Sequence, residues 1–506
     1  MYQHKFKVAA LPAWAAIATC LVPCVSGFCA RADTRQANYT ELAEQLSSSA
    51  LIYLPGSDTF EDAVARWSNL SVPVANVVVS PGSEEDVVTT VKFANKYQVP
   101  FLATNGFHGS ITTLGKMSSG IEIYLNQLNS VEISEDGQTA KIGGGIRSKN
   151  LTDALWAASK QTVTGTCECV SYLGPGLGGG HGWLQGHHGL VSDQFLSFNV
   201  VLADGSLVTV DESSDLFWGL KGAGHNFGIV TSVTSKIYDL TKPNYAVNTI
   251  FFSGDKVKEV YQLANELWIT NGTMPEDLNN WSYWFYDPTI DADKPVIAMY
   301  IIQEGVDVVD SVHTQPFLDL GPIMSQPQSG TYLDLGKWTG ISLADGPCQK
   351  TGNANPRFPI YLKQYNPEAQ AQVYELFRQA TTNDSTPFSG ALFMFEGYSQ
   401  QGLKAPGDEA SAFAYRSENL LVAPLLTYAP TGQAVEQAAY QLGNQIRDIL
   451  YQGSGESSLS TYVNYAYGDE TPKAWYGSES WRQDRLSALK KKYDPTAKFS
   501  FYAPIA

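Results

Sequence analysis

Basic side chains are in short supply in this sequence. Among 506 residues, 33 are Lys or Arg and 50 are Asp or Glu, which gives a formal net charge of −17 at pH 7. Nucleic acids and anionic membrane surfaces attract proteins through clusters of positive charge. The charge balance therefore excludes both as expected partners, and it does not indicate which small molecule would be a substrate.

Long apolar runs are also absent after the first thirty residues. Near the start, two lysines precede a mostly apolar stretch at 8–25, which Pro12 and Pro23 interrupt. This order is typical of a secretory signal peptide, which we expect at 1–27; the alternative is an N-terminal membrane anchor. With the signal removed, we expect a secreted chain, or one in the lumen of the secretory pathway, without a membrane partner.

Cysteine is sparse as well. Of six cysteines, three lie in or next to the expected signal segment. The others are Cys167, Cys169 and Cys348, an odd number, so at least one of them lacks an intramolecular partner. An unpaired thiol in a secreted protein calls for a functional explanation.

Six Asn-x-Ser/Thr sequons accompany the signal pattern. In a secreted chain such sequons are acceptors for N-linked glycans, and we expect several to be used. They begin at Asn38, Asn69, Asn150, Asn271, Asn280 and Asn383.

The first half of the chain alternates predicted strands and helices. Residues 76–80 and 100–103 are predicted strands, and Ser83 followed by three acidic residues is typical of the start of a helix between them. A loop rich in glycine and histidine follows at 104–110. A strand–helix–strand unit that ends in such a loop is typical of an α/β phosphate site.

The densest glycine cluster lies at 162–189, beside Cys167. Glycines without side chains let the backbone lie against a flat or anionic ligand. A Gly-x-Gly-x-x-Gly pattern occurs at 174–179, but its flanks lack the strand-to-helix context of a Rossmann site. We therefore predict that this stretch wraps a cofactor in another way.

The chain changes character after residue 242, where the glycine clusters stop. Residues 283–286, 296–302, 392–396 and 420–423 predict strands of a broad sheet. Alternate side chains of such a strand face opposite sides, one toward the core and one toward a pocket. The pocket candidates are Trp281, Tyr283, Trp284, Phe285 and Tyr286, followed by Phe393, Phe395, Tyr398, Tyr415 and Arg416.

Five ordered segments together resemble the FAD-linked oxidoreductases of the vanillyl-alcohol-oxidase type, in their berberine-bridge-enzyme-like, secreted fungal branch. The resemblance covers about 50–240 and 460–506. The segments are Thr104-Asn-Gly-Phe-His-Gly109, Gly165-Thr-Cys-x-x-Val170 with Gly178-Gly-Gly-His-Gly182, Asp215-Leu-Phe-Trp218 with Gly222 to Thr231, Tyr462-Val-Asn-Tyr465, and Lys491-Lys-Tyr-Asp-Pro495.

The resemblance implies an α+β fold with two domains of the PCMH type. One domain binds FAD and consists of two α/β subdomains. The other binds the substrate on a large antiparallel sheet covered by helices. The expected boundaries are 40–242 for the FAD-binding domain, 243–458 for the substrate domain, and 459–506 for a C-terminal segment that returns to the FAD domain.

The resemblance also implies an FAD held by two covalent bonds. His108 would bond the 8α carbon of the flavin and Cys167 would bond C6, since imidazole and thiolate are nucleophiles. Cys169 would then be free to pair with Cys348. Further expected cofactor contacts are Asn105, Gly106, Phe107, Gly109, Ser110, Gly178, Gly179, Gly180, His181, Gly182, Gly228, Ile229, Val230 and Asn464.

The sequence departs from the family pattern at several positions. Phe107 stands where the branch usually has Gly, His187 where Arg is common, and His225 where Gly is common. Together with His181, each of these histidines is either structural or a candidate acid–base group. Ala466 follows Tyr465 where Gln or Arg is frequent, which leaves the role of the tyrosine open.

The implied reaction is oxidation of a substrate C–H bond. A hydride passes from an alcohol or amine carbon of a secondary-metabolite intermediate to flavin N5, with or without oxidative cyclisation, and O2 reoxidises the flavin to give H2O2. Asn464 and Tyr465 are the expected catalytic residues. Tyr465 would act as a base only with a lowered pKa, and the alternative is that it only packs on the ring.

Two other functions stay open. Aromatic side chains also stack on sugars, so a carbohydrate or oligosaccharide oxidase with the same flavin is the first alternative. The second, of a different class, is a non-redox flavin-containing cyclase or binding protein. We expect no metal and a monomeric enzyme that takes a small-molecule substrate and O2.

Overall fold

The strands form four sheets within the described residues, which are 37–270, 274–382 and 386–505 of a computed structural model. The expected signal segment 1–27 and the sequons at Asn271 and Asn383 lie outside these residues. No helix in the described part of the chain combines the length and apolar character that a membrane span needs.

The first sheet consists of β1 (Leu51–Tyr53), β2 (Val77–Ser80), β3 (Phe101–Thr104) and β4 (Ile121–Tyr124). In the sequence, α1 (Tyr39–Gln45) precedes β1, α2 (Asp58–Val64) follows it, and α3 (Glu84–Tyr97) lies between β2 and β3. Its order is β1-β2-β4-β3, with β2, β4 and β3 parallel and β1 antiparallel. The Ser83 side chain caps α3 by accepting from the backbone N–H of Asp86. Both predicted strands and the helix between them are confirmed.

The second sheet is antiparallel and has the order β5-β6-β10-β8-β9. A separate pair of short strands, β7 and β11, lies beside the chain that leaves this sheet. The elements are β5 (Val131–Ile133), β6 (Thr139–Gly143), β7 (Lys160–Gln161), β8 (Phe195–Val201), β9 (Leu207–Asp211), β10 (Ile229–Lys236) and β11 (Tyr238–Asp239), with α4 (Ser148–Ala157), α5 (Leu173–Leu177), α6 (Gln185–His188) and α7 (Asp215–Ala223).

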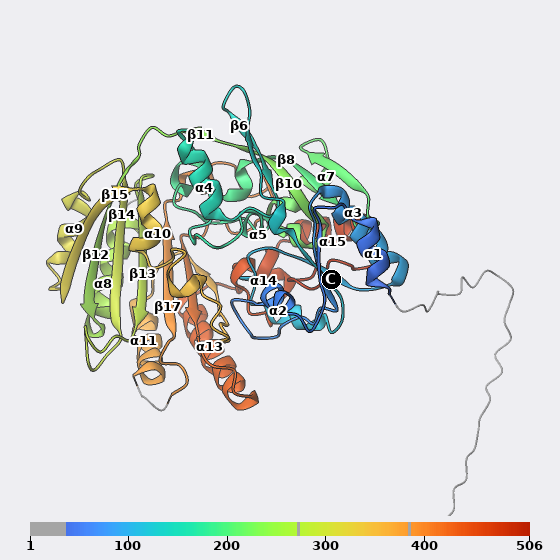
Figure 1. Ribbon diagram of the computed structural model, residues 1–506. Coiled ribbons are helices and arrows are strands. Elements are labelled where there is room, and N and C mark those ends of the chain that lie inside the picture. Colours follow the sequence, from blue (N-terminus) through green and yellow to red (C-terminus); the bar gives the residue numbers. More distant parts are fainter. Residues whose placement is uncertain (1–36, 271–273, 383–385, 506) are drawn as a thin grey trace, which may run out of the picture. The chain divides into compact units, whose positions relative to one another are not determined.

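The third large sheet has seven antiparallel strands in the order β15-β12-β14-β13-β17-β18-β16 (Figure 1). It contains all four strands that the sequence predicts after residue 242. The strands are β12 (Asn244–Ser253), β13 (Leu278–Phe285), β14 (Val296–Glu304), β15 (Met324–Thr331), β16 (Ile360–Leu362), β17 (Leu392–Tyr398) and β18 (Leu420–Leu425).

Helices cover one face of this seven-stranded sheet. Trp284, Phe393 and Phe395 point to that face and share a core with residues of the covering helices. Trp281 and Tyr283 belong to a different cluster on the other face, as the alternation of a strand requires. The helices of this part are α8 (Val257–Trp268), α9 (Ser311–Leu318), α10 (Leu335–Trp338), α11 (Pro367–Thr381), α12 (Gln401–Lys404) and α13 (Gln433–Ser454).

The end of the chain packs on the second sheet. The elements there are the 3₁₀ turn η8 (Val463–Tyr465), α14 (Pro472–Tyr476) and α15 (Ser480–Tyr493). Their apolar side chains share one buried cluster with residues of β6, β8 and β10. The two-domain α+β fold is therefore confirmed, while the boundaries expected at residues 242 and 458 stay a prediction.

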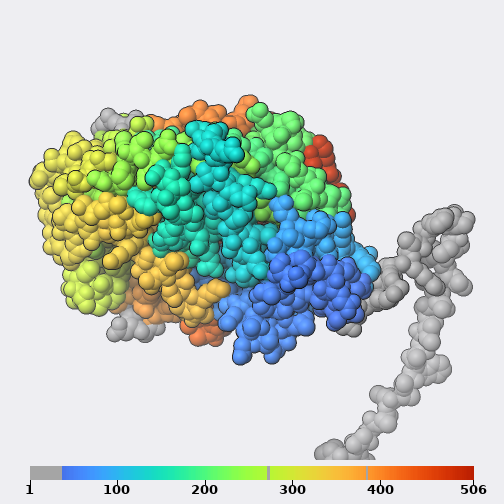
Figure 2. Space-filling view, turned by 45° about the horizontal axis from the view of Figure 1, so that its top comes forward, coloured from blue at the N-terminus to red at the C-terminus, as the bar shows by residue number. Residues whose placement is uncertain are grey.

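Contacts between the two halves of the chain are direct. The backbone N–H of Glu168 donates to Ile341 O at 3.2 Å, and that of Asn69 donates to Asn353 O at 2.8 Å. Figure 2 shows the surface that results, in which yellow-orange atoms border cyan and blue atoms of the amino-terminal half.

A buried ion pair strengthens this junction. Arg416 donates to both carboxylate oxygens of Asp193 at 2.7 and 2.9 Å, and also to Leu403 O and Ser411 Oγ. The side chains of Arg416 and Asp193 are 1% and 8% exposed. A bidentate pair removed from water holds the two segments in one geometry.

Replacing Arg416 by Met is expected to destabilise the fold by about 3–5 kcal/mol, because the Asp193 carboxylate would stay buried without its counter-ion. Thermal unfolding of the purified variant measures the change. Arg378→Met is the control: Arg378 pairs with Glu375 on the exposed side of α11, and its loss should cost no more than about 1 kcal/mol. Equal losses for the two variants would contradict the role of the buried pair.

Candidate active site

A cavity of about 320 Å³ lies where the three large sheets and the C-terminal segment meet. This volume is within the range of small-molecule sites. Its wall includes the loop after β3, the segment around Cys167, the turn before β10, one face of β13 and β17, and the stretch around Tyr465. Segments that are far apart in the sequence therefore meet at one site.

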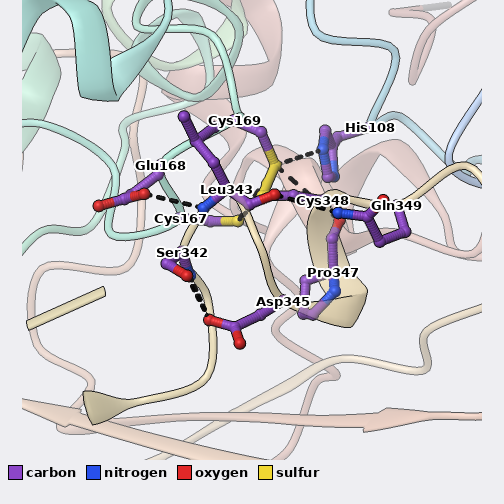
Figure 3. The surroundings of a disulfide bond; sticks show 10 residues. All are labelled: His108, Cys167, Glu168, Cys169, Ser342, Leu343, Asp345, Pro347, Cys348 and Gln349. Atoms are coloured by element: carbon purple, nitrogen blue, oxygen red, sulfur yellow. Dashed lines mark hydrogen bonds between the residues drawn. A yellow bond between two sulfur atoms is a disulfide. The ribbon is translucent and has the colours of Figure 1, made fainter. Parts of the chain in front are cut away.

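His108 and Cys167 both line this cavity beside a disulfide bond (Figure 3). Cys169 and Cys348 are joined, a pairing that the sequence left open, and Cys167 is a free thiol. The Cys167 Sγ atom lies 3.7 Å from that of Cys169 and 3.8 Å from that of Cys348. Because two of the three sulfurs are bonded to each other, the cluster is not a set of thiolates for a metal ion.

The disulfide also determines the tautomer of His108. His108 Nε2 lies 3.2 Å from Cys169 Sγ. A disulfide sulfur carries no proton, so Nε2 must donate, and the free lone pair is left on Nδ1. Burial, followed by the charges of Arg357, Arg147 and Lys350, lowers the pKa of His108 to about 3, so the ring is neutral at physiological pH.

Cys167 differs from the expected thiolate. Burial raises the pKa of its thiol to about 11. At neutral pH the sulfur is therefore protonated, and it becomes a nucleophile only when a neighbouring group takes its proton.

Phe107 has a backbone conformation that suits the glycine of the family pattern, and contacts of its ring hold it there. Its φ is 59°, in the left-handed region that favours glycine. Its ring is buried between two cations, with the Arg66 guanidinium 5.1 Å and the Lys350 ammonium 4.9 Å from the ring centroid. The ring also packs edge-on against Tyr124 at 4.8 Å. These contacts hold a phenylalanine in a backbone conformation that it rarely adopts.

Most of the predicted cofactor contacts line the cavity. They are Asn105, Gly106, Phe107, His108, Gly109, Cys167, His181, Gly228, Ile229, Val230 and Asn464. Ser110 and the glycines at 178, 179, 180 and 182 do not belong to the wall.

These four glycines face other parts of the protein. A Cβ atom on Gly178 would lie 2.3 Å from Asn464 Oδ1, and one on Gly179 would lie 2.5 Å from the Phe413 ring. A Cβ atom on Gly182 would lie 2.1 Å from Thr164 O. Distant protein segments therefore occupy the space that side chains at these positions would need, and contact of these glycines with the cofactor stays a prediction.

Several buried polar atoms on the wall have no hydrogen-bond partner among the described residues. Such atoms are rare in folded proteins and indicate a missing partner. They come from separate segments of the chain, so one ligand with several polar groups would satisfy them. The atoms are Thr104 Oγ1, Asn105 Oδ1, His225 Nδ1, Trp281 Nε1 and Tyr283 OH.

Glu396 is the buried acid of the site. Its Oε1 accepts from the Tyr465 hydroxyl at 2.9 Å and its Oε2 accepts from the Tyr398 hydroxyl at 2.7 Å. The side chain is 1% exposed, and burial raises its pKa although both tyrosines and Arg357 oppose the shift. The sequence prediction missed this residue, although a lone carboxylate within the apolar strand Leu392–Tyr398 was a visible signal.

The two residues expected to be catalytic have different surroundings. Burial and the neighbouring Glu396 raise the pKa of Tyr465 well above its usual range. The hypothesis that Tyr465 acts as a base required a lowered pKa, and that expectation is wrong. Asn464 donates to Pro175 O at 2.9 Å and to the Tyr462 hydroxyl at 2.7 Å, which fixes η8 against α5.

The three histidines that were candidate acid–base groups are held by protein contacts. His181 bonds to Gln185 at 2.6 Å and to the Tyr361 hydroxyl at 2.8 Å. His187 bonds to Glu304 at 2.6 Å and lies outside the cavity wall. His225 bonds to Gly174 O at 3.0 Å, with its second nitrogen unpartnered at the cavity.

The substrate-side wall comes from β13 and β17. Trp281, Tyr283 and Tyr398 line the cavity, together with Leu392 and Met394. The other aromatic candidates face elsewhere: Trp284, Phe393 and Phe395 lie in the core under the helices, and Phe285, Tyr286, Tyr415 and Arg416 are not part of the wall.

The sequons differ in exposure. Asn38, Asn69 and Asn150 are exposed. Asn280 is 2% exposed within β13, and its side chain donates to Tyr300 O at 3.1 Å. The expectation of a glycan at Asn280 is therefore wrong, because the folded sheet leaves no room for one.

Comparison with known proteins places these features in a family. Residues 75–211 match the family described as FAD binding domain, and residues 461–506 match Berberine and berberine like. FAD-linked oxidoreductase chyH of Penicillium rubens is 59% identical over 94% of each chain. FAD-linked oxidoreductase chry5 of Gibberella zeae is 54% identical over 94% of this chain and 96% of its own.

Solved structures share the fold at low identity. Physcomitrella patens BBE-like 1 superposes with a TM-score of 0.77 at 20% identity, over 92% of this chain and 99% of its own. Xylooligosaccharide oxidase from Myceliophthora thermophila gives a TM-score of 0.78 at 19% identity, over 93% of this chain and 99% of its own.

The double variant Cys169→Ser/Cys348→Ser should unfold at a lower temperature, with a loss of about 2–5 kcal/mol, because the bond closes a long loop across the site. Thermal unfolding with and without a reductant tests this. The reductant should lower the midpoint of the unmodified protein and leave that of the variant unchanged. A variant as stable as the unmodified protein would show that the disulfide contributes nothing.

Proposed function

This chain belongs to the berberine-bridge-enzyme-like FAD-linked oxidoreductases, and we propose that it is a secreted oxidase that takes a hydride from an alcohol or amine carbon of a secondary-metabolite intermediate. The observation that carries the proposal is one cavity lined by two pairs of residues. His108 and Cys167 line it beside the disulfide, and Glu396 and Tyr465, joined by a hydrogen bond, line it as well. The first pair suits cofactor attachment and the second suits proton transfer.

Several residues of this chain would hold FAD. His108 Nδ1 has the free lone pair for one covalent bond, and the Cys167 sulfur, once a neighbouring group has taken its proton, would be the nucleophile for the other. The unpartnered side chains of Thr104 and Asn105 would bond to its polar groups. When bound, FAD would supply the oxidant: it would accept the two electrons of the substrate C–H bond as a hydride, and O2 would then take up two electrons and two protons to give H2O2.

Glu396 is the proposed proton acceptor. A substrate O–H or N–H that donates to the Tyr465 oxygen would let Tyr465 pass its own proton to Glu396 Oε1. One proton leaves the substrate and one arrives on the carboxylate, so Tyr465 ends unchanged. Glu396 Oε2 is occupied by Tyr398, which leaves Oε1 as the route. A raised carboxyl pKa makes this transfer more favourable than with an exposed acid.

The shape of the wall favours a planar, largely apolar substrate. Trp281, Tyr283 and Tyr398 offer aromatic surface, and Leu392 and Met394 add aliphatic surface. A carbohydrate oxidase remains the second candidate, because sugars also stack on aromatic rings. A panel of aromatic alcohols, aromatic amines and oligosaccharides, assayed for flavin bleaching and H2O2, separates the two. Bleaching by no member would favour a non-redox role.

Acid denaturation tests the cofactor attachment. The unmodified protein should retain its yellow colour in the precipitate, because two covalent bonds survive unfolding. His108→Ala and Cys167→Ala should each retain flavin through the remaining bond, and the double variant should release it all. Free flavin in the supernatant of the unmodified protein would contradict covalent attachment without affecting the assignment of the proton acceptor.

Glu396→Gln should lower kcat by about 10²–10⁴-fold, because an amide accepts no proton. In the unmodified enzyme, kcat/KM should rise with pH through a carboxyl pKa above its ordinary value of about 4.3, since only ionised Glu396 is active. Glu396→Gln should abolish this rise. The assay uses the panel member that bleaches the flavin fastest.

Tyr398→Phe is the matched control for that experiment. It removes a hydrogen bond that lowers the pKa of Glu396. The rise of kcat/KM with pH should therefore move to higher pH, while the value of kcat/KM on the high-pH plateau changes little. Tyr465→Phe should move the rise in the same direction and also lower the plateau. An unchanged pH profile in Glu396→Gln would rule out this carboxylate as the acceptor.

A further inference from the structure

Arg357 is a cation on the cavity wall without a protein partner. Among the described residues it makes no ion pair and no side-chain hydrogen bond, and its buried Nε has no acceptor. The four buried arginines of the described residues all have an acidic partner: Arg66 with Glu122, Arg416 with Asp193, Arg447 with Glu470 and Arg482 with Glu479. In a chain with an excess of 17 negative charges, an unpaired guanidinium beside a cavity requires an explanation.

Two aromatic rings hold the Arg357 side chain in place. The guanidinium carbon lies 4.3 Å from the Tyr465 ring centroid and 4.6 Å from that of Trp67. Stacking of this kind uses the faces of the guanidinium plane. The N–H groups point outward in the plane, so they stay available to an acceptor of matching geometry.

The position of Arg357 ties it to the proposed chemistry. Its ring partner Tyr465 is the residue that bonds to Glu396 Oε1. The Trp67 ring on which Arg357 also stacks lies against the His108 ring, with centroids 5.4 Å apart, so Arg357 stands between the proposed attachment residue and the Tyr465–Glu396 pair. A substrate group bound by Arg357 would therefore hold the reacting carbon close to the proposed proton acceptor.

The neighbouring wall supplies further free donors. Trp281 Nε1 and Tyr283 OH are buried without partners and project from the same face of β13. Trp281 lies directly across from Glu396 in the pairing of β13 and β17. Leu392, Met394 and Leu425 add apolar surface to the same wall. Donors at one place and apolar surface elsewhere match a planar anion on an aromatic body.

We propose that Arg357 binds the carboxylate of the substrate, which is an aromatic acid that also carries the oxidisable alcohol or amine carbon. A carboxylate offers two oxygens to the planar fork, and Lys at this position would offer only a point charge. This inference rests on the proposed function of the same cavity. It makes Arg357 a specificity-determining residue, separate from the proton acceptor.

Ligand binding tests the proposal without turnover. Benzoate and its neutral analogue benzyl alcohol are titrated into the flavin-loaded protein, and binding is followed by the flavin difference spectrum and by tryptophan fluorescence, to which Trp67 contributes. The unmodified protein should bind benzoate more tightly than benzyl alcohol. Arg357→Gln should weaken benzoate binding at least about tenfold and leave benzyl alcohol unchanged, because a charge-assisted pair is lost.

Two further variants sharpen the comparison. Arg357→Lys should retain only part of the benzoate preference, because it keeps the charge and loses the fork. Arg378→Gln removes an exposed arginine from α11 and should change neither affinity. Thermal unfolding and flavin content of each variant show whether the site is intact.

Three results would overturn the proposal. They are an unmodified protein that does not prefer benzoate, an Arg357→Gln variant that loses both ligands equally, and a variant that loses flavin while its ligand preference is unchanged. The last result would assign Arg357 to the cofactor. Failure of the proposed function is a separate outcome, because it would appear as full activity in Glu396→Gln.

Discussion

The buried carboxylate of Glu396 is the group on which the geometry of the cavity depends. An acid removed from water is costly unless hydrogen bonds satisfy it, and here two tyrosines do so. Tyr398 comes from the same strand, whereas Tyr465 comes from the C-terminal segment that packs on the second sheet. The acid therefore fixes the substrate sheet relative to the part of the chain that carries His108 and Cys167.

The attachment wall is organised by a second local constraint. The Cys169–Cys348 disulfide places the 341–349 segment against Cys167 and His108. It also assigns the proton on His108 to Nε2 and leaves Nδ1 free. Phe107 adds to this arrangement, because its ring contacts hold the loop in a left-handed conformation without a glycine. A covalent bond and a buried ring thus orient the two expected attachment residues.

The sequence predicted the parts of the site that depend on short motifs and on strand alternation. His108, Cys167 and Tyr465 lie at the cavity as their motifs indicate, and Trp281 and Tyr283 face it as alternate residues of β13. The roles of Gly178 and Glu396 were not predicted, because they depend on residues far away in the chain. Gly178 has no side chain, and this leaves room for Asn464. Glu396 gains its role from the hydrogen bond that Tyr465 donates to it. Such pairings arise only in the folded chain.

The central claim is that this cavity holds a flavin bonded to both His108 and Cys167, facing Glu396. Mass mapping of peptides from the purified, untreated protein tests it most directly. After reduction of the disulfide, we expect the peptide with His108 and the peptide with Cys167 to be recovered joined through a flavin. Recovery of both peptides separately and at their unmodified masses would contradict it.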